Sequence, residues 1–375
     1  MKQCIGILLA FLVFFAMHPI ADVYAAPEIS AQAAILMEYR TFDVLYEKNA
    51  YEKRSMASTT KIMTTLLTLE SGDLDKPFQV DSDAIHVEGS SMGLREGDIV
   101  TKRALCYGMM LPSGNDAANA SAVAVAGSIG EFAKLMNARA AEIGMTRTCF
   151  VTPSGLEGEG HGSSAFDMAL LTREALGNPE FRAICGAPSA RLEFGYPPYT
   201  RRLYNSNKLL SMYEGVIGVK TGFTDEAGRC LVSACERDGI TLICVTLNAP
   251  DDWNDHKKLY DMGFSSLHAQ KLDTPENLTL PVVGGMSDIV TLAPAEAFTA
   301  GCADKLPEIS HVFRRAPFAY APIHKGDALG TLEFWCNDRK IAETPLLAGE
   351  DISVSPHEPG AWKRLGAWMT HLLQQ

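Results

Sequence analysis

The first half of the chain carries apolar residues at helical spacing. Between residues 57 and 70 they cover more than one face of a helix, which is typical of a helix buried on most sides. Further helices are predicted downstream, and Gly127 and Gly144 mark the ends of two of them. Their ranges are 105–110, 117–126 and 129–143. The middle of the chain is therefore expected to be helical.

Short apolar runs replace the helical pattern from about residue 216. The runs are 216–221, 230–235 and 240–247. Glycine-containing turns separate them, which predicts an antiparallel meander. A helical pattern over residues 252–262, followed by Gly263, predicts a helix that ends there and packs back on this sheet.

After about residue 270, strand candidates alternate with turns rich in Pro, Gly and Asp. Their ranges are 278–283, 289–293 and 329–336. This pattern predicts a small all-β domain over residues 275–350. Because 375 residues exceed the usual size of one compact domain, we expect a larger domain as well, at residues 26–270. The predicted class is α/β in the broad sense (α+β), with an antiparallel sheet and a helical region in the larger domain.

The N-terminus has the pattern of a secretory signal peptide over residues 1–25. Lys2 precedes an apolar run at residues 5–17, and small residues, Val23 and Ala25, occupy the positions that a signal peptidase reads. The run is short for a membrane span. We expect cleavage near Ala25 and export of the rest; an uncleaved anchor is the alternative.

The net charge of −12 argues against nucleic acid as a partner, because phosphate binding requires a basic surface. Loss of residues 1–25 removes one Lys and one Asp, so the charge is unchanged. The remaining cysteines form neither CxxC pairs nor a compact disulfide framework, and Cys230, Cys235 and Cys244 lie in apolar runs, where buried free thiols are expected. Because the histidines form no HExxH motif, we predict no metal and no other cofactor.

Three short motifs carry the candidate chemistry. They are Ser58-Thr59-Thr60-Lys61, Ser113-Gly114-Asn115 and Lys220-Thr221-Gly222. Each motif alone is weak evidence, and a chain of this length should contain SxxK about once by chance. Their order along the chain, SxxK then SxN then KTG, is the signature of penicillin-binding proteins and related β-lactamases.

The first motif pairs a nucleophile with a base. Ser58 and Lys61 are three residues apart on a predicted helix, so they share one face. A serine hydroxyl needs a neighbouring base to become a nucleophile, and a lysine serves as that base only when its pKa is lowered. Burial, or the charge of Lys220, would lower it.

The second and third motifs supply the remaining groups. Ser113 lies in a predicted loop, from which its hydroxyl could pass a proton to the leaving amine, while Asn115 could hold either a substrate peptide bond or the Lys61 amine. The strand ending at Lys220-Thr221-Gly222 could bind an extended peptide, with Lys220 and Thr221 near its carboxylate. The N–H groups of Ser58 and Phe223 would form an oxyanion hole.

The sequence resembles the low-molecular-mass penicillin-binding proteins of the DacA/DacF type, which act as D-alanyl-D-alanine carboxypeptidases. The segments that carry the resemblance are 55–66, 89–98, 108–120, 136–156, 204–210, 218–234 and 324–334. The resemblance implies a penicillin-binding/β-lactamase-like transpeptidase fold and acyl transfer from the D-Ala-D-Ala end of peptidoglycan stem peptides to Ser58. Lys61, Ser113 and Lys220 match the family's base, proton-relay and substrate-binding positions. β-Lactam antibiotics would be covalent inhibitors.

One departure and several alternatives remain. Some members carry an arginine, which helps to bind the terminal carboxylate, in the segment that matches residues 205–207, where this chain has Ser206. A class A β-lactamase requires an E-x-x-L-N segment, and residues 116–219 contain none. The motifs do not discriminate a carboxypeptidase from a transpeptidase or endopeptidase of the same fold. A non-catalytic wall-binding protein is disfavoured by the complete motif set.

The last segment, residues 356–375, fits an amphipathic helix. Its apolar face holds Trp362, Leu365, Met369, Leu372 and Leu373, beside Lys363 and Arg364. A helix of its last 14 residues would reach roughly 21 Å, short of the ~30 Å hydrocarbon core, so it would lie on a membrane surface. The alternative is a terminal helix docked on the protein. We expect the protein at the outer face of the cytoplasmic membrane or in the cell wall.

Overall fold

The computed structural model of the chain describes residues 27–306 and 308–356. The chain packs as two compact units. Among the described residues, unit 1 contains 27–36, 45–234 and 243–266, and unit 2 contains 37–44, 235–242, 267–306 and 308–356. The units do not divide at a single position in the sequence, because the ends of four strands belong to unit 2.

Unit 1 is built around a five-stranded sheet in the order β2-β1-β9-β8-β7. The strands are β1 (Ala33–Glu38), β2 (Val44–Lys48), β7 (Val216–Thr224), β8 (Gly228–Arg237) and β9 (Ile240–Leu247). The predicted meander is the β7-β8-β9 half of this sheet. The other half comes from the N-terminus, which the sequence pattern did not predict.

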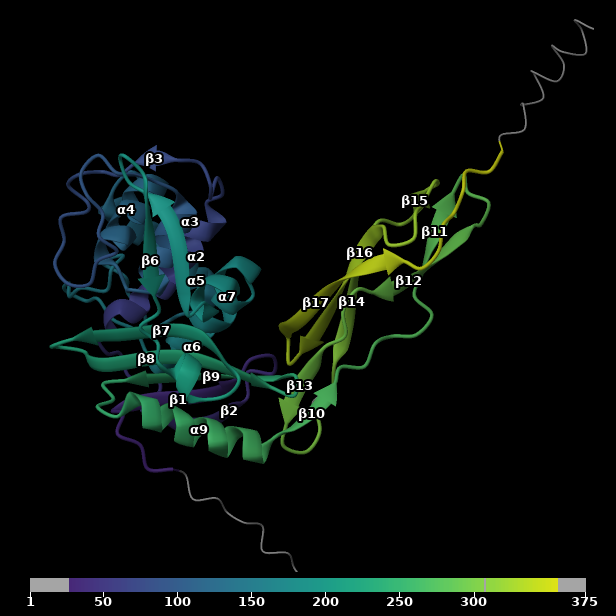
Figure 1. Cartoon of the computed structure of the whole chain (residues 1–375). Helices are drawn as coiled ribbons and strands as arrows, with labels where there is room; N and C mark the ends of the chain where they lie inside the picture. The colour runs from purple at the N-terminus through teal and green to yellow at the C-terminus, as the bar shows by residue number, and fades with distance from the viewer. Residues whose placement is uncertain (1–26, 307, 357–375) are drawn as a thin grey trace, which may run out of the picture. The chain divides into compact units, whose positions relative to one another are not determined.

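The centre of the sheet is covered on both faces. Every residue of β1 and β9 is buried, which accounts for their largely apolar sequences. Helix α9 (Asp252–Ser266) runs along one face, and the helical region lies on the other (Figure 1). The predicted end of this helix at Gly263 is wrong: Gly263 is buried inside the last turn. A glycine costs a helix only about 1 kcal/mol, which packing offsets.

The helical region of unit 1 follows the predicted pattern closely. Its elements are the 3₁₀ turn η1 (Ala57–Thr60) and the helices α2 (Lys61–Glu70), α3 (Lys102–Met110), α4 (Asn115–Ala126), α5 (Ile129–Ile143), α6 (Ala165–Leu176), α7 (Pro179–Gly186) and α8 (Leu209–Met212). Most side chains of α2 are buried, as expected for the most apolar helix. Gly127 and Gly144 end α4 and α5 with positive φ angles. The sequence pattern did not predict helices α6, α7 and α8.

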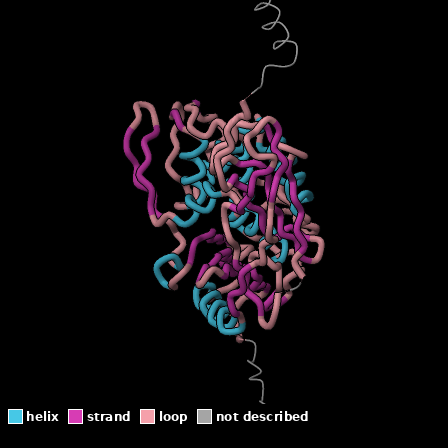
Figure 2. The backbone as a smooth tube through the Cα atoms, turned by 90° about the vertical axis from the view of Figure 1, so that its right-hand side faces the viewer, coloured by secondary structure: helices cyan, strands magenta, loops and turns pink. Residues whose placement is uncertain are grey.

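Two small sheets complete unit 1. Strands β3 (Phe78–Gln79) and β4 (Ile99–Val100) pair with each other, as do β5 (Ser189–Phe194) and β6 (Tyr199–Tyr204). The β5–β6 hairpin lies at one side of unit 1 (Figure 2), and its turn contacts β4, where the Gly195 N–H donates to the Ile99 oxygen at 2.9 Å.

Unit 2 is an all-β structure, as the sequence predicted for this part of the chain. Six strands form one sheet in the order β14-β16-β17-β12-β11-β15, and β10 pairs with β13. The strands are β10 (His268–Lys271), β11 (Thr279–Val283), β12 (Ile289–Pro294), β13 (Thr299–Cys302), β14 (Ser310–Arg315), β15 (Ala319–Tyr320), β16 (Ala328–Cys336) and β17 (Arg339–Ala348). Alternate residues of β11 and β12 point into a core that includes Leu332, Phe334 and Leu346.

Several sequence predictions concern cysteines, metals and membranes. Cys230, Cys235 and Cys244 are buried, as predicted, and none of them forms a disulfide with another described cysteine. Within the described ranges, no three acidic, His or Cys side chains are grouped to hold a metal ion. No helix among those residues has the length and hydrophobicity needed to cross a bilayer. The predicted signal peptide and nearly all of the predicted C-terminal helix, from residue 357, lie outside the described residues.

Candidate active site

Ser58 and Lys61 are brought together by a tight turn at the start of α2. Ser58 lies in η1, and Lys61 opens the α-helix that follows. The Lys61 Nζ donates a hydrogen bond of 2.8 Å to the Ser58 Oγ. Ser58 is partly exposed, whereas Lys61 is fully buried. The predicted single helix over residues 57–70 is thus a 3₁₀ turn followed by an α-helix, and the two side chains still share a face.

The Lys61 amine is enclosed by acceptors and lies beside another lysine. Besides Ser58, it donates to the Asn115 Oδ1 at 2.6 Å and to the carbonyl oxygen of Ser154 at 2.6 Å. Burial lowers the pKa of Lys61 well below its usual value; the charge of Lys220 lowers it further, and Asp116 opposes this. Burial therefore favours the neutral amine. In that form the amine keeps two N–H groups, for Asn115 and the Ser154 carbonyl, and its lone pair can accept from the Ser58 hydroxyl, as a base requires.

Lys220 lies on β7 and is also fully buried. Its Nζ donates to the backbone oxygen of Thr221 at 2.8 Å. Burial lowers the pKa of Lys220 to about 7. Lys220 is thus positioned to act on Lys61 through its charge.

The Ser113-Gly114-Asn115 motif contacts the Ser58-Lys61 motif through the side-chain amide of Asn115. Asn115 accepts from Lys61 with its oxygen and donates with its Nδ2 to the Glu88 carbonyl at 2.7 Å. Of the two predicted roles of Asn115, the structure shows the contact that the second requires, a hydrogen bond to the Lys61 amine. Ser113 has a φ of 66°, a backbone conformation that costs a non-glycine residue free energy and that is concentrated at functional sites.

A buried carboxylate fixes the loop beside this motif. Asp116 accepts from the backbone N–H groups of Met92, Gly93 and Leu94, at 2.9–3.0 Å, and from the Ser91 hydroxyl. The same loop supplies the Glu88 carbonyl that orients Asn115. Asp116 therefore acts on the site by holding a loop, a role that the motif alone does not reveal.

A second loop, residues 152–163, supplies the Ser154 carbonyl. His161 accepts from the Val151 N–H at its Nδ1, so its Nε2 carries the proton and donates to the Thr60 Oγ1 at 3.0 Å. Burial lowers the pKa of His161 to about 4, with Lys53 adding to the effect and Glu157 opposing it, so the ring is neutral at pH 7. The histidine ties this loop to the residue before Lys61.

The end of β7 lies directly against η1. A Cβ on Gly222 would come within 3.2 Å of the Ser58 nitrogen and 3.1 Å of the Met56 oxygen. Only glycine permits this approach without displacing the backbone of η1. The approach brings β7 close to the Ser58 N–H, the first of the two predicted oxyanion-hole donors.

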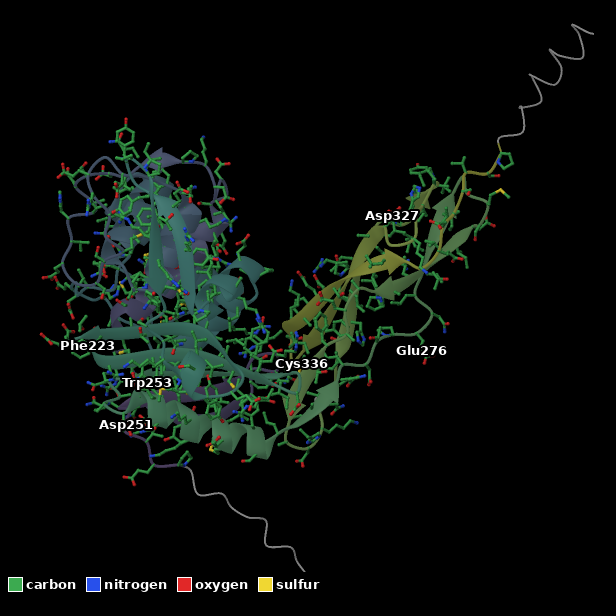
Figure 3. All side chains as sticks on the ribbon, viewed as in Figure 1. Phe223, Asp251, Trp253, Glu276, Asp327 and Cys336 are labelled. Carbon is green, nitrogen blue, oxygen red and sulfur yellow. The ribbon has the colours of Figure 1, made fainter. Side chains whose placement is uncertain are left out.

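A cleft of about 360 Å³ opens over the serine. Its lining residues are Ser58, Ser90, Pro112, Ser113, Ser206, Lys208, Thr221, Gly222, Phe223, Arg229, Asp252 and Trp253. Phe223 and Trp253 lie at the same end of the unit 1 sheet (Figure 3). The cleft therefore joins the nucleophile, the strand edge and the start of α9.

Most of the predicted site residues meet here. Ser58, Ser113, Thr221, Gly222 and Phe223 line the cleft, whereas Lys61, Asn115 and Lys220 lie buried behind its wall. The sequence reasoning missed Asp116, His161, Arg229 and Asp252. An acidic residue in the first turn of a helix is common, so neither Asp116 nor Asp252 gave a distinguishing signal.

A serine paired with a buried lysine, an adjoining asparagine and a close strand edge defines a serine hydrolase of the penicillin-binding class. Residues 21–251 match the Peptidase S11 family model, described as D-alanyl-D-alanine carboxypeptidase. The chain belongs to this family and is a serine-type D-Ala-D-Ala carboxypeptidase of peptidoglycan metabolism. Residues 276–354 match the C-terminal domain of penicillin-binding protein 5.

Individual relatives agree with the family match. The chain is 33% identical to D-alanyl-D-alanine carboxypeptidase DacF of Bacillus subtilis, over 90% of both chains. Penicillin-binding protein 5 of Haemophilus influenzae has a similar structure (TM-score 0.63, 26% identity), covering 88% of this chain and 99% of its own. A mutant of the Streptomyces K15 DD-transpeptidase matches with a TM-score of 0.61 and 33% identity, covering 64% of this chain and 99% of its own.

Proposed function

We propose that Ser58 is the residue acylated during the carboxypeptidase reaction and that Lys61 is its base. The observation that carries the proposal is the 2.8 Å hydrogen bond between a fully buried lysine, whose pKa is lowered, and a serine hydroxyl in the cleft. The neutral Lys61 amine takes the Ser58 proton as the oxygen attacks the carbonyl between the two D-alanines. The C–N bond to the terminal D-alanine then breaks, and D-alanine leaves with that proton on its amine. Water hydrolyses the ester left on Ser58 and releases the shortened peptide.

The other motif residues have supporting roles in this proposal. Asn115 holds the Lys61 amine in place, and Ser113, at the edge of the cleft, passes a proton to the departing D-alanine. The N–H groups of Ser58 and Phe223 stabilise the oxyanion. Lys220 keeps Lys61 neutral through its charge, and Thr221 and Gly222 offer the edge of β7 to the peptide.

Replacement of the two central residues tests the mechanism. Ser58→Ala removes the nucleophile, and Lys61→Arg replaces the base with a group that stays protonated; each should lower D-alanine release from a D-Ala-D-Ala pentapeptide by at least about 10³-fold. Both variants should remain folded by circular dichroism. Penicillin should add one covalent adduct, mapped to Ser58 by mass spectrometry, in the unaltered protein only. An adduct on another residue would contradict the proposal.

Transpeptidation is a second candidate activity. It uses the same acyl-enzyme and differs only in whether water or an amine resolves it. The observation in its favour is the similarity to the Streptomyces K15 protein, which is described as a DD-transpeptidase. Product analysis with an added amino acceptor separates the two, because only transpeptidation yields a new amide.

We also propose that the protein works outside the cytoplasm, on a membrane surface. The sequence of residues 1–25 and the amphipathic pattern of residues 356–375 support this proposal. Fractionation of cells that produce the full chain, or a chain ending at residue 355, tests it. Equal recovery of both chains in the soluble fraction would contradict the membrane part.

A further inference from the structure

A carboxypeptidase of this kind must recognise the negative charge at the end of its substrate. Lys220 is poorly placed to do so alone, because it is fully buried and its Nζ is engaged by the Thr221 carbonyl. Among the described residues, the cations that line the cleft are Lys208 and Arg229. These two cations differ in how firmly their side chains are oriented toward a carboxylate.

Arg229 is held rigidly at the start of β8. Its Nε and Nη2 both donate to the Asp252 Oδ1, at 3.1 and 2.8 Å. The Asp252 side chain is only 3% exposed, whereas that of Arg229 is 42% exposed. The guanidinium also lies 5.6 Å from the centre of the Trp253 ring. A buried acceptor and an aromatic neighbour thus fix the cation at the surface of the cleft.

The bonds to Asp252 occupy one edge of the guanidinium and leave another available. A guanidinium carries five N–H groups in a planar fork. Asp252 takes the edge formed by Nε and Nη2. The edge formed by Nη1 and the second Nη2 hydrogen keeps two parallel N–H groups, the arrangement that binds a carboxylate with two hydrogen bonds. In the described part of the chain, Nη1 has no hydrogen-bond partner.

Two hydroxyl groups lie in the same cleft. The Ser206 Oγ and the Thr221 Oγ1 are 2.9 Å apart, and both residues line the cleft with Arg229 and Ser58. Lys208, by contrast, is an exposed side chain with no carboxylate to orient it among the described contacts. The guanidinium of Arg229, already fixed in place, loses less conformational entropy on binding a carboxylate than the mobile ammonium group of Lys208 does.

We propose that Arg229, oriented by Asp252, binds the terminal carboxylate of the substrate, with the Ser206 and Thr221 hydroxyls completing the subsite. The chain thereby discriminates peptides with a free C-terminal carboxylate from those without one. This inference rests on the proposed acylation of Ser58. It assigns to Arg229 on β8 the carboxylate-binding role for which the segment 205–207, with Ser206, offers no arginine.

The test compares two substrates that differ only at the end. One is diacetyl-L-Lys-D-Ala-D-Ala, and the other is the same peptide with a C-terminal amide. Arg229→Gln should lower kcat/KM on the acid about 100-fold, mainly through KM, because it removes hydrogen bonds between charged groups. Activity on the amide should stay within about threefold. Equal losses on both substrates, or an acid value within threefold of the unaltered protein, would overturn the proposal.

Two further variants separate binding from folding. Arg229→Gln leaves Asp252 buried without its cation, which can destabilise the protein. The double variant Arg229→Gln/Asp252→Asn removes both charges and should show the same selective loss on the acid. Arg229→Lys keeps the ion pair without the fork and should lose about tenfold on the acid alone. Full activity of the double variant on the acid would overturn the proposal.

Lys208→Gln decides between the two cations. We expect this variant to keep the preference for the acid over the amide, and loss of that preference would transfer the role to Lys208. Penicillin acylation of the unaltered protein monitors the proposed function separately. If penicillin acylates Ser58 but the Arg229→Gln variant keeps its preference for the acid, the proposed role of Arg229 is overturned. The proposed role of Ser58 as the nucleophile then stands.

Discussion

Lys61 can act as a base only if it loses its proton near neutral pH, and two features of its surroundings favour that loss. Burial disfavours the charged amine, and the nearby charge of Lys220 disfavours it further. The sequence predicted both causes. It did not predict the Ser154 carbonyl, which accepts from Lys61 at 2.6 Å, because a backbone atom of a distant loop leaves no mark in a motif.

The pH profile of Lys220→Gln tests this coupling. Loss of the Lys220 charge raises the pKa of Lys61, so Lys61 becomes neutral only at higher pH and the acidic limb of the profile moves upward. A shift of about one pH unit is expected for charges this close. The measurement is the second-order rate constant of penicillin acylation between pH 5 and 9.

Lys220→Arg is the matched control for that experiment. It keeps a positive charge at the site, so its acidic limb should stay near that of the unaltered protein even if its maximal rate falls. Superimposable limbs for Lys220→Gln and the unaltered protein would show that Lys220 does not set the pKa of Lys61.

At the scale of elements, η1 is held between β7 and the loop of residues 152–163. A Cβ on Gly222 would press on one side of it, and a Cβ on Gly155 would lie 2.0 Å from the Ala57 oxygen on the other. The helical and strand patterns predicted α2 and β7 well, since each has strong periodicity or β-rich composition. These patterns could not predict that β7 and the loop of residues 152–163 both contact the backbone of η1.

Gly155→Ala tests the importance of this contact. Its φ of 86° and the clash with Ala57 should lower the free energy of unfolding by at least about 2 kcal/mol more than Gly160→Ala does. Gly160 is a matched control in the same loop, because its φ is 80° and nothing lies within 4 Å of a Cβ there. Urea denaturation measures both. Similar free energies of unfolding for the two variants would show that the loop moves to accommodate the extra Cβ atom at little cost.

At the scale of the whole molecule, every residue that lines the cleft belongs to unit 1. The Streptomyces K15 protein, which matches 64% of this chain over 99% of its own length, has no counterpart for the remaining third. A protein similar to this chain thus consists of the part that matches unit 1, without the C-terminal β structure.

A chain containing only residues 27–266 should keep its reaction with penicillin. We expect an acylation rate within about fivefold of the full chain, because the nucleophile, its base and the cleft are all retained. Its free energy of unfolding should fall, since β10–β13 pairing and the buried contact from the Gly301 N–H to Glu38 are lost. Loss of acylation in a fragment that circular dichroism shows to be folded would contradict this prediction.

The sequence by itself determined the family resemblance, the three motifs and the helical and β-rich segments, because catalysis fixes residue types at short spacing and burial fixes periodicity. It did not determine the contributions of β1 and β2 to the sheet, since strand pairing between distant segments depends on the packed fold. The same holds for Arg229 and Asp252. They are 23 residues apart, and only the packing of α9 against the sheet brings this pair to the cleft with Ser58.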